Sequence, residues 1–287
     1  MITIKLPGCC FVLAAALLSM RAVAQQSGMT ESRAYRLVWS DEFSRPGAPD
    51  TSVWSFERGF VRNHEDQWYQ PQNAYCKRGK LVIEAKRVHL PNPGYVAGSP
   101  DWRKSEKWIG YTSACLVTKG RKAWQYGRFV MRARISVDKG LWPAFWTLGV
   151  RGRWPSNGEI DIMEYYRGML LANIARGTEK PFVAKWFSNR RPMSVFPKGW
   201  SRRFHVWRMD WDEKDIKLYV DDMLMNEVPL DSLVNPGGVN PFMQPHYILL
   251  NMAVGGDNGG DPAHTRFPRK FEIDYVRVYQ RSASGEK

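Results

Sequence analysis

The chain has 287 residues and a formal net charge of +14, and its five histidines are scattered without the spacing of a metal site. No glycine-rich phosphate loop is present, which excludes the common nucleotide-binding motifs. The length exceeds that of most single domains, although all-β sandwiches of this size often form one unit.

The first residues have the three regions of a secretory signal peptide. Lys5 supplies the charged region, residues 11–18 form an apolar run, and Ala22-Val23-Ala24 is a typical cleavage site. The apolar run is too short to span a bilayer, and no other segment is long and apolar enough. We therefore expect residues 1–24 to be a signal peptide and residues 25–34 a disordered lead-in. The mature chain would be secreted or periplasmic, so nucleic acid is not an expected partner despite the positive charge.

Strand-like alternation recurs through the rest of the chain. Helical periodicity is nearly absent, and turn residues such as Asp221-Asp222 separate the alternating runs at 80–86, 127–137, 204–211, 216–220 and 271–279. Many short strands of this kind predict an all-β fold, a sandwich of two sheets or a jelly roll. No repeat or linker divides residues 35–281, so we predict a single domain.

Three acidic residues lie within one predicted strand, at Glu159, Asp161 and Glu164, with apolar residues between them. Alternation puts Glu159 and Asp161 on one face but would turn Glu164 to the buried face. A β-bulge, which adds one residue to one strand, would return Glu164 to the face of the other two. We therefore predict a bulge between Asp161 and Glu164.

Clustered carboxylates cannot all ionise cheaply, so one pKa should be raised and the group divided into an acid and a base. Retaining glycosidases need two carboxyl groups about 5–5.5 Å apart, which two positions on one strand face could supply. From the residues alone, a solvated edge-strand face and a cation site remain alternatives.

Residues 159–164, preceded by residues 141–149, resemble the signature of glycoside hydrolase family 16. The likeness continues in residues 39–43, 73–74, 79–83, 126–129, 250–256 and 273–279. The two residues between Asp161 and Glu164 resemble the laminarinase, agarase and carrageenase branches. The resemblance implies a concanavalin-A-like jelly roll of two antiparallel sheets, with a concave sheet forming a cleft for a polysaccharide.

The resemblance also implies the roles of the acidic residues. Glu159 would be the nucleophile and Glu164 the acid/base, while Asp161 would hold Glu159 by a hydrogen bond and keep Glu164 protonated by repulsion. No cofactor is needed for this chemistry. A β-1,3-glucan of laminarin type is the expected substrate. The alternatives are a galactan such as agar, porphyran or carrageenan, a transglycosylase using the same residues, and a non-catalytic carbohydrate-binding protein.

Aromatic residues near the acidic strand are candidate sugar platforms. Trp142 and Trp146 are four residues apart, hence on one strand face, and the resemblance places both near the sugar beside the cut bond. For these two, core packing is the alternative. Trp154 is a third candidate for the same floor. The polar segment of the family's cleft rim corresponds to Asn63, Glu65 and Gln67, which are either hydroxyl partners or part of a solvated loop.

The resemblance further places a structural calcium near Glu42 and Asp274, with a backbone carbonyl near Gly79 as a third ligand. Surface acids or salt bridges are the alternative. Cys76 and Cys115 remain after signal removal and form either a disulfide or two buried thiols.

Basic residues flank or follow the acidic strand at Arg151, Arg153, Arg167, Arg176, Lys185, Arg190 and Arg191. They form either an electropositive cleft for a sulfated polymer or a solvated surface. We expect a monomer.

Overall fold

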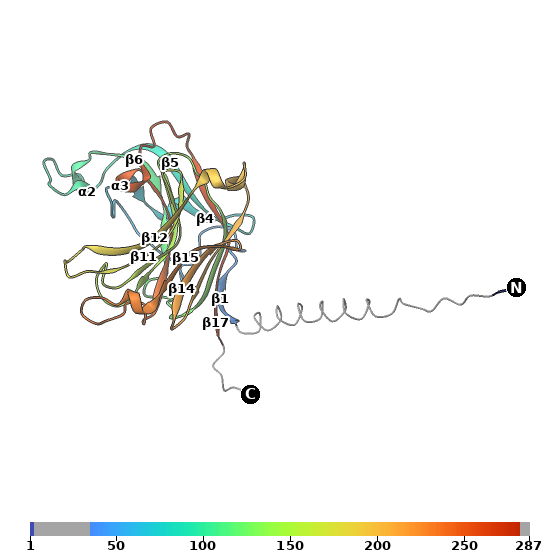
Figure 1. The fold of residues 1–287 in the computed structure, drawn as a ribbon. Coiled ribbons are helices and arrows are strands. Elements are labelled where there is room, and N and C mark those ends of the chain that lie inside the picture. Colours follow the sequence, from blue (N-terminus) through green and yellow to red (C-terminus); the bar gives the residue numbers. More distant parts are fainter. Residues whose placement is uncertain (3–34, 282–287) are drawn as a thin grey trace.

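The computed structural model describes residues 1–2 and 35–281 (Figure 1). The predicted signal peptide and lead-in therefore lie outside the described residues, apart from the first two. In the part that is described, none of the helices has the length and hydrophobicity needed to cross a bilayer.

The described residues form two β-sheets, which confirms the predicted all-β fold (Figure 1). The ten-stranded sheet has the order β15-β14-β13-β8-β17-β5-β6-β3, with β1 paired to β17 and β4 to β5. Its strands are β1 (Tyr35–Asp41), β3 (Gln67–Tyr69), β4 (Ala74–Cys76), β5 (Leu81–Pro91), β6 (Trp108–Ser113), β8 (Gly127–Arg134), β13 (His205–Trp211), β14 (Asp215–Val220), β15 (Met223–Pro229) and β17 (Arg269–Arg281).

The seven-stranded sheet has the order β12-β11-β10-β9-β16-β7-β2 and pairs antiparallel throughout the described ladders. Its strands are β2 (Ser55–Phe56), β7 (Cys115–Val117), β9 (Leu141–Gly149), β10 (Glu159–Tyr166), β11 (Met169–Gly177), β12 (Ala184–Pro192) and β16 (His246–Val254). The helical segments are one turn long: η1 (Pro71–Asn73), α2 (Trp102–Ser105), η2 (Met193–Val195), η3 (Trp200–Arg202), η4 (Leu230–Leu233) and α3 (Gly256–Gly259).

The main hydrophobic core includes residues of both sheets. Phe129 and Phe271 come from the ten-stranded sheet and Phe145 from the seven-stranded sheet, and all three are fully buried. Strand β13 alternates between buried and partly exposed residues, as expected for a sheet with one face on the core. Strands β9 and β16, in contrast, are buried almost throughout. Both faces of the seven-stranded sheet are therefore covered at its centre.

A second, smaller hydrophobic cluster explains that burial. Its members are Tyr69, Cys115, Val117, Ala144, Trp146, Tyr247 and Leu249. Ala144 and Trp146 of β9 and Tyr247 and Leu249 of β16 alternate with residues of the main core, so they lie on the opposite face of the same strands. Tyr69 brings β3 onto this face and excludes water from its centre.

Cys76 and Cys115, the cysteines among the described residues, are free and buried, one in each sheet. Of the two alternatives, the structure has the pair of buried thiols. Burial raises the pKa of Cys76 to about 11 and raises the pKa of Cys115 well above its usual range. Neither thiol is therefore activated as a nucleophile.

Phe145 links the two sheets at the centre of the core, so its removal tests the packing. Phe145→Ala should lower the free energy of unfolding by about 3–5 kcal/mol, because it leaves a cavity between the sheets. Urea denaturation would measure the loss. Leu224→Ala, at a 41% exposed position in β15, is the control and should change stability by less than about 1 kcal/mol. Equal losses in the two variants would contradict this account of the core.

Candidate active site

Strand β10 contains a β-bulge between Asp161 and Glu164. Asp161 pairs with Asn173 of β11, but the register then shifts before Glu164, and β9 shows the matching shift on its side. As a result, the consecutive residues Ile162 and Met163 both enter the main core. The extra residue returns Glu164 to the face that carries Asp161, so the predicted bulge is confirmed.

Hydrogen bonds hold the two buried carboxylates together. The side-chain amide of Asn173 donates to Glu164 Oε2 at 2.9 Å and to Asp161 Oδ2 at 3.3 Å. The indole N–H of Trp142 donates to the other oxygen of Glu164 at 2.5 Å. Glu164 therefore has a fixed orientation, with one donor on each oxygen. The sequence analysis did not identify Asn173. Its signal in the sequence is that it is the polar residue within the apolar run from Leu170 to Ala175.

Glu159 lies at the start of β10 and is more exposed than the other two carboxylates. It accepts a 2.5 Å hydrogen bond from the indole N–H of Trp154, which is 38% exposed. A hydrogen bond with Asp161 also lowers the pKa of Glu159. Trp154 thus lies beside the carboxylate with an indole surface open to solvent.

Burial and mutual repulsion separate the pKa values of the three carboxyl groups. Burial, followed by the charge of Glu159, raises the pKa of Glu164 to about 8, while the Trp142 hydrogen bond opposes the rise. Burial and the charges of Glu159 and Glu164 raise the pKa of Asp161 well above its usual range. Burial also raises the pKa of Glu159, but the donors Trp154 and Asp161 oppose it.

These directions assign the protons within the group. Glu164, whose pKa is raised to about 8, is protonated near neutral pH, and the hydrogen bonds from Trp154 and Asp161 favour the ionised form of Glu159. The sequence analysis assigned the repulsion on Glu164 to Asp161. In the structure the charge of Glu159 contributes to the raised pKa of Glu164, after burial.

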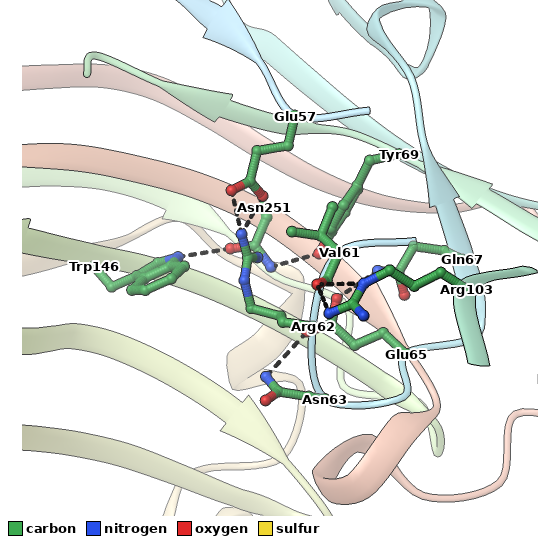
Figure 2. Close-up of polar contacts among 10 residues, drawn as sticks. All are labelled: Glu57, Val61, Arg62, Asn63, Glu65, Gln67, Tyr69, Arg103, Trp146 and Asn251. Atoms are coloured by element: carbon green, nitrogen blue, oxygen red, sulfur yellow. Dashed lines mark hydrogen bonds and ion pairs between the residues drawn. The ribbon is translucent and has the colours of Figure 1, made fainter. Parts of the chain in front are cut away.

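Trp142 and Trp146 are buried, with 6% and 8% of their surface exposed, so their rings offer little area to a sugar. Trp146 donates its indole N–H to Asn251 Oδ1 at 2.7 Å, and Asn251 donates to the hydroxyl of Tyr69 at 3.0 Å (Figure 2). Here both tryptophans orient polar groups. Their contact with a sugar stays a prediction.

Arg62 is a cation beside the carboxylates that the sequence analysis missed. Its guanidinium pairs with both oxygens of Glu57 and lies over the ring of Trp146, 5.2 Å from the centroid (Figure 2). Its Nη1 atom is buried without a hydrogen-bond partner. The charge of Arg62 also lowers the pKa of Glu159, which favours the ionised form of that carboxylate.

The three predicted rim residues lie beside Arg62, but two of them are buried (Figure 2). Gln67 donates to Glu65 Oε2 at 2.7 Å and accepts the backbone N–H of Val254, which fastens this segment to β16. Asn63 is partly exposed and donates to Glu65 Oε1 at 3.3 Å. Asn63 is therefore the residue of the three with groups free to reach a ligand. Sugar binding by this set stays a prediction.

Two surface pockets lie near the carboxylates without including them. One of about 360 Å³ is lined by Glu65, Asp66, Trp102 and Trp108, and another of about 670 Å³ by Arg151, Ser156, Asn235 and neighbouring residues. Of the three carboxylates, Glu159 is partly exposed, while Asp161 and Glu164 are buried on the same sheet face. Neither pocket encloses them, as a site for a small ligand usually would.

The predicted calcium ligands have arginine partners. Glu42 accepts two 2.8 Å hydrogen bonds from Arg277, which lower its pKa, and Asp274 pairs with Arg132. Across the described ranges, no three His, Cys, Asp or Glu residues come together as a metal site. As these side chains lie, they do not fit a calcium ion. The calcium site was an expectation from the family resemblance, and the arginine pairs argue against it.

A family model, Glycosyl hydrolases family 16, matches residues 62–277. A β-glucanase from Rhodothermus marinus is 36% identical, over 86% of this chain and 85% of that protein. Two other curated relatives are longer proteins, of which the chain spans 38% and 35%.

Two solved structures share the fold. The laminarinase catalytic domain from Thermotoga maritima is 31% identical with a TM-score of 0.72, covering 87% of this chain and 99% of that one. A structure reported with endo-acting O-glycanases of the human gut microbiota, which initiate mucin breakdown, is 34% identical. Its TM-score is 0.79, covering 87% of this chain and 92% of that one.

The raised pKa of Glu164 predicts a pH-dependent stability. Folding favours the protonated acid, so its contribution is complete below the unfolded pKa near 4.5 and is lost as pH rises towards about 8. Glu164→Gln removes this titration. The difference in free energy of unfolding between the variant and the wild type should be roughly 1–3 kcal/mol more favourable to the variant at pH 8 than at pH 5. Urea unfolding at both pH values would measure the gain, with the exposed Glu179→Gln as control. A gain independent of pH would refute the assignment.

The arginine pairs at Glu42 and Asp274 predict an insensitivity to calcium. Because each carboxylate is already neutralised, the midpoint of thermal unfolding should be the same in excess calcium and in chelator. Differential scanning calorimetry in the two buffers would decide. If the midpoint instead rose by several degrees in calcium, and Glu42→Gln abolished that rise, calcium would have displaced the arginines from these carboxylates.

Proposed function

The chain belongs to glycosyl hydrolase family 16 and is a glycoside hydrolase, and we propose that it is a retaining endo-β-glycanase that cuts β-1,3-linked glucan. One observation carries the mechanism: the bulge in β10 gathers three carboxyl groups of unequal pKa on one open sheet face. Such a set provides a nucleophile, a proton donor and a group that orients the nucleophile.

In the first step, ionised Glu159 attacks the anomeric carbon and forms the glycosyl-enzyme. Glu164 gives its proton to the leaving glycosidic oxygen, so the bond breaks without releasing an alkoxide. Asp161 keeps its proton and donates it as a hydrogen bond to Glu159, which directs the attacking oxygen. Trp154 donates to the other side of this carboxylate.

In the second step, Glu164 acts as the conjugate base. It takes a proton from water, which attacks the anomeric carbon and releases Glu159 with net retention of configuration. Trp142 and Asn173 support this exchange because their N–H groups stabilise the carboxylate form of Glu164. A transglycosylase would follow the same path with a sugar hydroxyl in place of water.

The substrate assignment rests on the relatives, which are named as a β-glucanase and a laminarinase. The signal-type residues 1–24 support action outside the cytoplasm, and we propose a monomer that needs no cofactor. A galactan or a related glycan is the second candidate. Two observations favour this second candidate. The chain is similar to the structure reported with endo-acting O-glycanases, and arginines lie around β10.

Product analysis tests the proposal. Residues 25–287 would be incubated with laminarin, mixed-linkage glucan, agarose, porphyran and carrageenan, and the anomer of the first product read by proton NMR. Glucose oligomers from laminarin with a β anomer support it. Galactose oligomers would keep the mechanism and replace the substrate. An α anomer would exclude the retaining mechanism.

Glu159→Gln tests the nucleophile. The amide cannot form the glycosyl-enzyme, so kcat on laminarin should fall by at least roughly 10³-fold while binding of laminarin oligosaccharides persists. Initial rates and isothermal titration calorimetry would measure the two quantities. Glu179→Gln, at an exposed glutamate, serves as control and should keep the wild-type kcat. Substantial activity in Glu159→Gln would give the nucleophilic role to another residue.

A further inference from the structure

Strand β12 forms the outer edge of the seven-stranded sheet, two strands from β10. The register connects the two strands residue by residue across β11. Glu159 is level with Ala175 and Trp186, Asp161 with Asn173 and Ser188, and Glu164 with Leu171 and Arg190. Residues directly opposite in antiparallel pairs project from the same face. Trp186, Ser188 and Arg190 therefore share the face of the carboxylates.

The residues between them project the other way. Phe187 packs against the main core, and the Nζ atom of Lys185 lies over the Phe187 ring, 5.3 Å from its centroid. By alternation Arg191 belongs to this opposite set as well. The basic residues of β12 are thus divided between two faces, with Arg190 on the catalytic side and Lys185 and Arg191 on the other.

Trp186 and Arg190 are exposed although they stand beside a buried site. Trp186 is 45% exposed and lies on the same row as Glu159, next to which Trp154 also presents its ring. Arg190 lies level with Glu164, and its charge opposes the rise that burial causes in the pKa of nearby Tyr166. An exposed indole and an exposed guanidinium thus lie on the strand face that carries the carboxylates, where a polysaccharide bound to these groups could reach both.

The opposite side of the carboxylates is arranged differently. On that side Trp146 is buried. Arg62 lies over its ring, and its indole N–H donates a hydrogen bond to Asn251. An endo-acting enzyme must hold sugar units on both sides of the bond it cuts. The β12 side offers the exposed aromatic surface that Trp142 and Trp146 do not provide.

We propose that Trp186 and Arg190 form a sugar-binding subsite on the β12 side of the cleavage point. The indole of Trp186 stacks on the apolar face of one sugar ring, and Arg190 donates hydrogen bonds to the hydroxyl oxygens of a neighbouring ring. This inference rests on the proposed glycanase function. It adds Trp186, to which the sequence analysis gave no role, and it selects Arg190 from the basic residues around β10.

Binding and kinetics of matched variants test the subsite. Trp186→Ala and Arg190→Ala are compared with Lys185→Ala and Arg191→Ala, which change the same strand on its other face. Calorimetry in the Glu159→Gln background uses laminarin oligosaccharides of increasing length. Trp186→Ala should weaken binding of the longer oligosaccharides about tenfold, and Arg190→Ala several-fold. The two control variants should stay within about twofold of the parent.

The kinetic pattern separates a subsite from a structural role. With wild-type carboxylates, Trp186→Ala should raise KM for laminarin while kcat and the pH profile stay unchanged, and Trp186→Phe should restore most of the affinity. Equal binding by Trp186→Ala and its parent, or equal losses in Lys185→Ala, would overturn the inference.

The same experiment distinguishes failure of the proposed substrate. If the enzyme cleaves a galactan and no glucan, the glucan assignment is wrong, and the variants are compared on oligomers of that galactan with the same expected ranking. If no polymer of the panel is cleaved or bound, both the proposed function and this subsite are refuted.

Discussion

One additional residue in β10 is the constraint on which the site depends. Without the bulge, strict alternation would turn Glu164 into a core of Phe, Ile and Met side chains, where an unpaired carboxyl group is strongly unfavourable. With it, Ile162 and Met163 enter the core side by side and fix the bulge by packing. The position of Glu164 is therefore determined by apolar burial on the far side of its own strand.

Burial also sets the chemistry of the carboxyl groups. The second hydrophobic cluster excludes water from the sheet centre, and desolvation is the largest contribution to each raised pKa. Hydrogen bonds then distinguish groups that burial alone would treat alike. Hydrogen bonds from Trp154 and Asp161 lower the pKa of Glu159, whereas the charges of Glu159 and Glu164 raise the pKa of Asp161 further. Burial in the scaffold raises the pKa values of all three carboxyl groups, and hydrogen bonds from a few indole and amide N–H groups make these values differ.

The sequence contained the period-2 patterns, and these predicted the sheet architecture, the acidic strand and its bulge. Asn173 and Arg62 were not predictable in the same way, because their roles depend on β11 pairing in one register and on a distant loop reaching Trp146. The orientation of Trp142 and Trp146 is similar. Their spacing placed both on one strand face and the family resemblance placed them near the sugar, but only packing decided that their rings are buried. Local periodicity predicts the face of the strand on which a side chain lies, whereas the pairing of distant segments decides which side chains it contacts.

Strand β12 has one further consequence, for self-association. As the last strand of its sheet it has an outer edge without a partner strand among the described residues, and such edges can pair with another copy of the chain. Lys185, Arg190 and Arg191 place positive charge on both faces of this edge. If two copies met edge to edge, these like charges would come together and repel each other. The basic residues of β12 therefore disfavour aggregation through this edge.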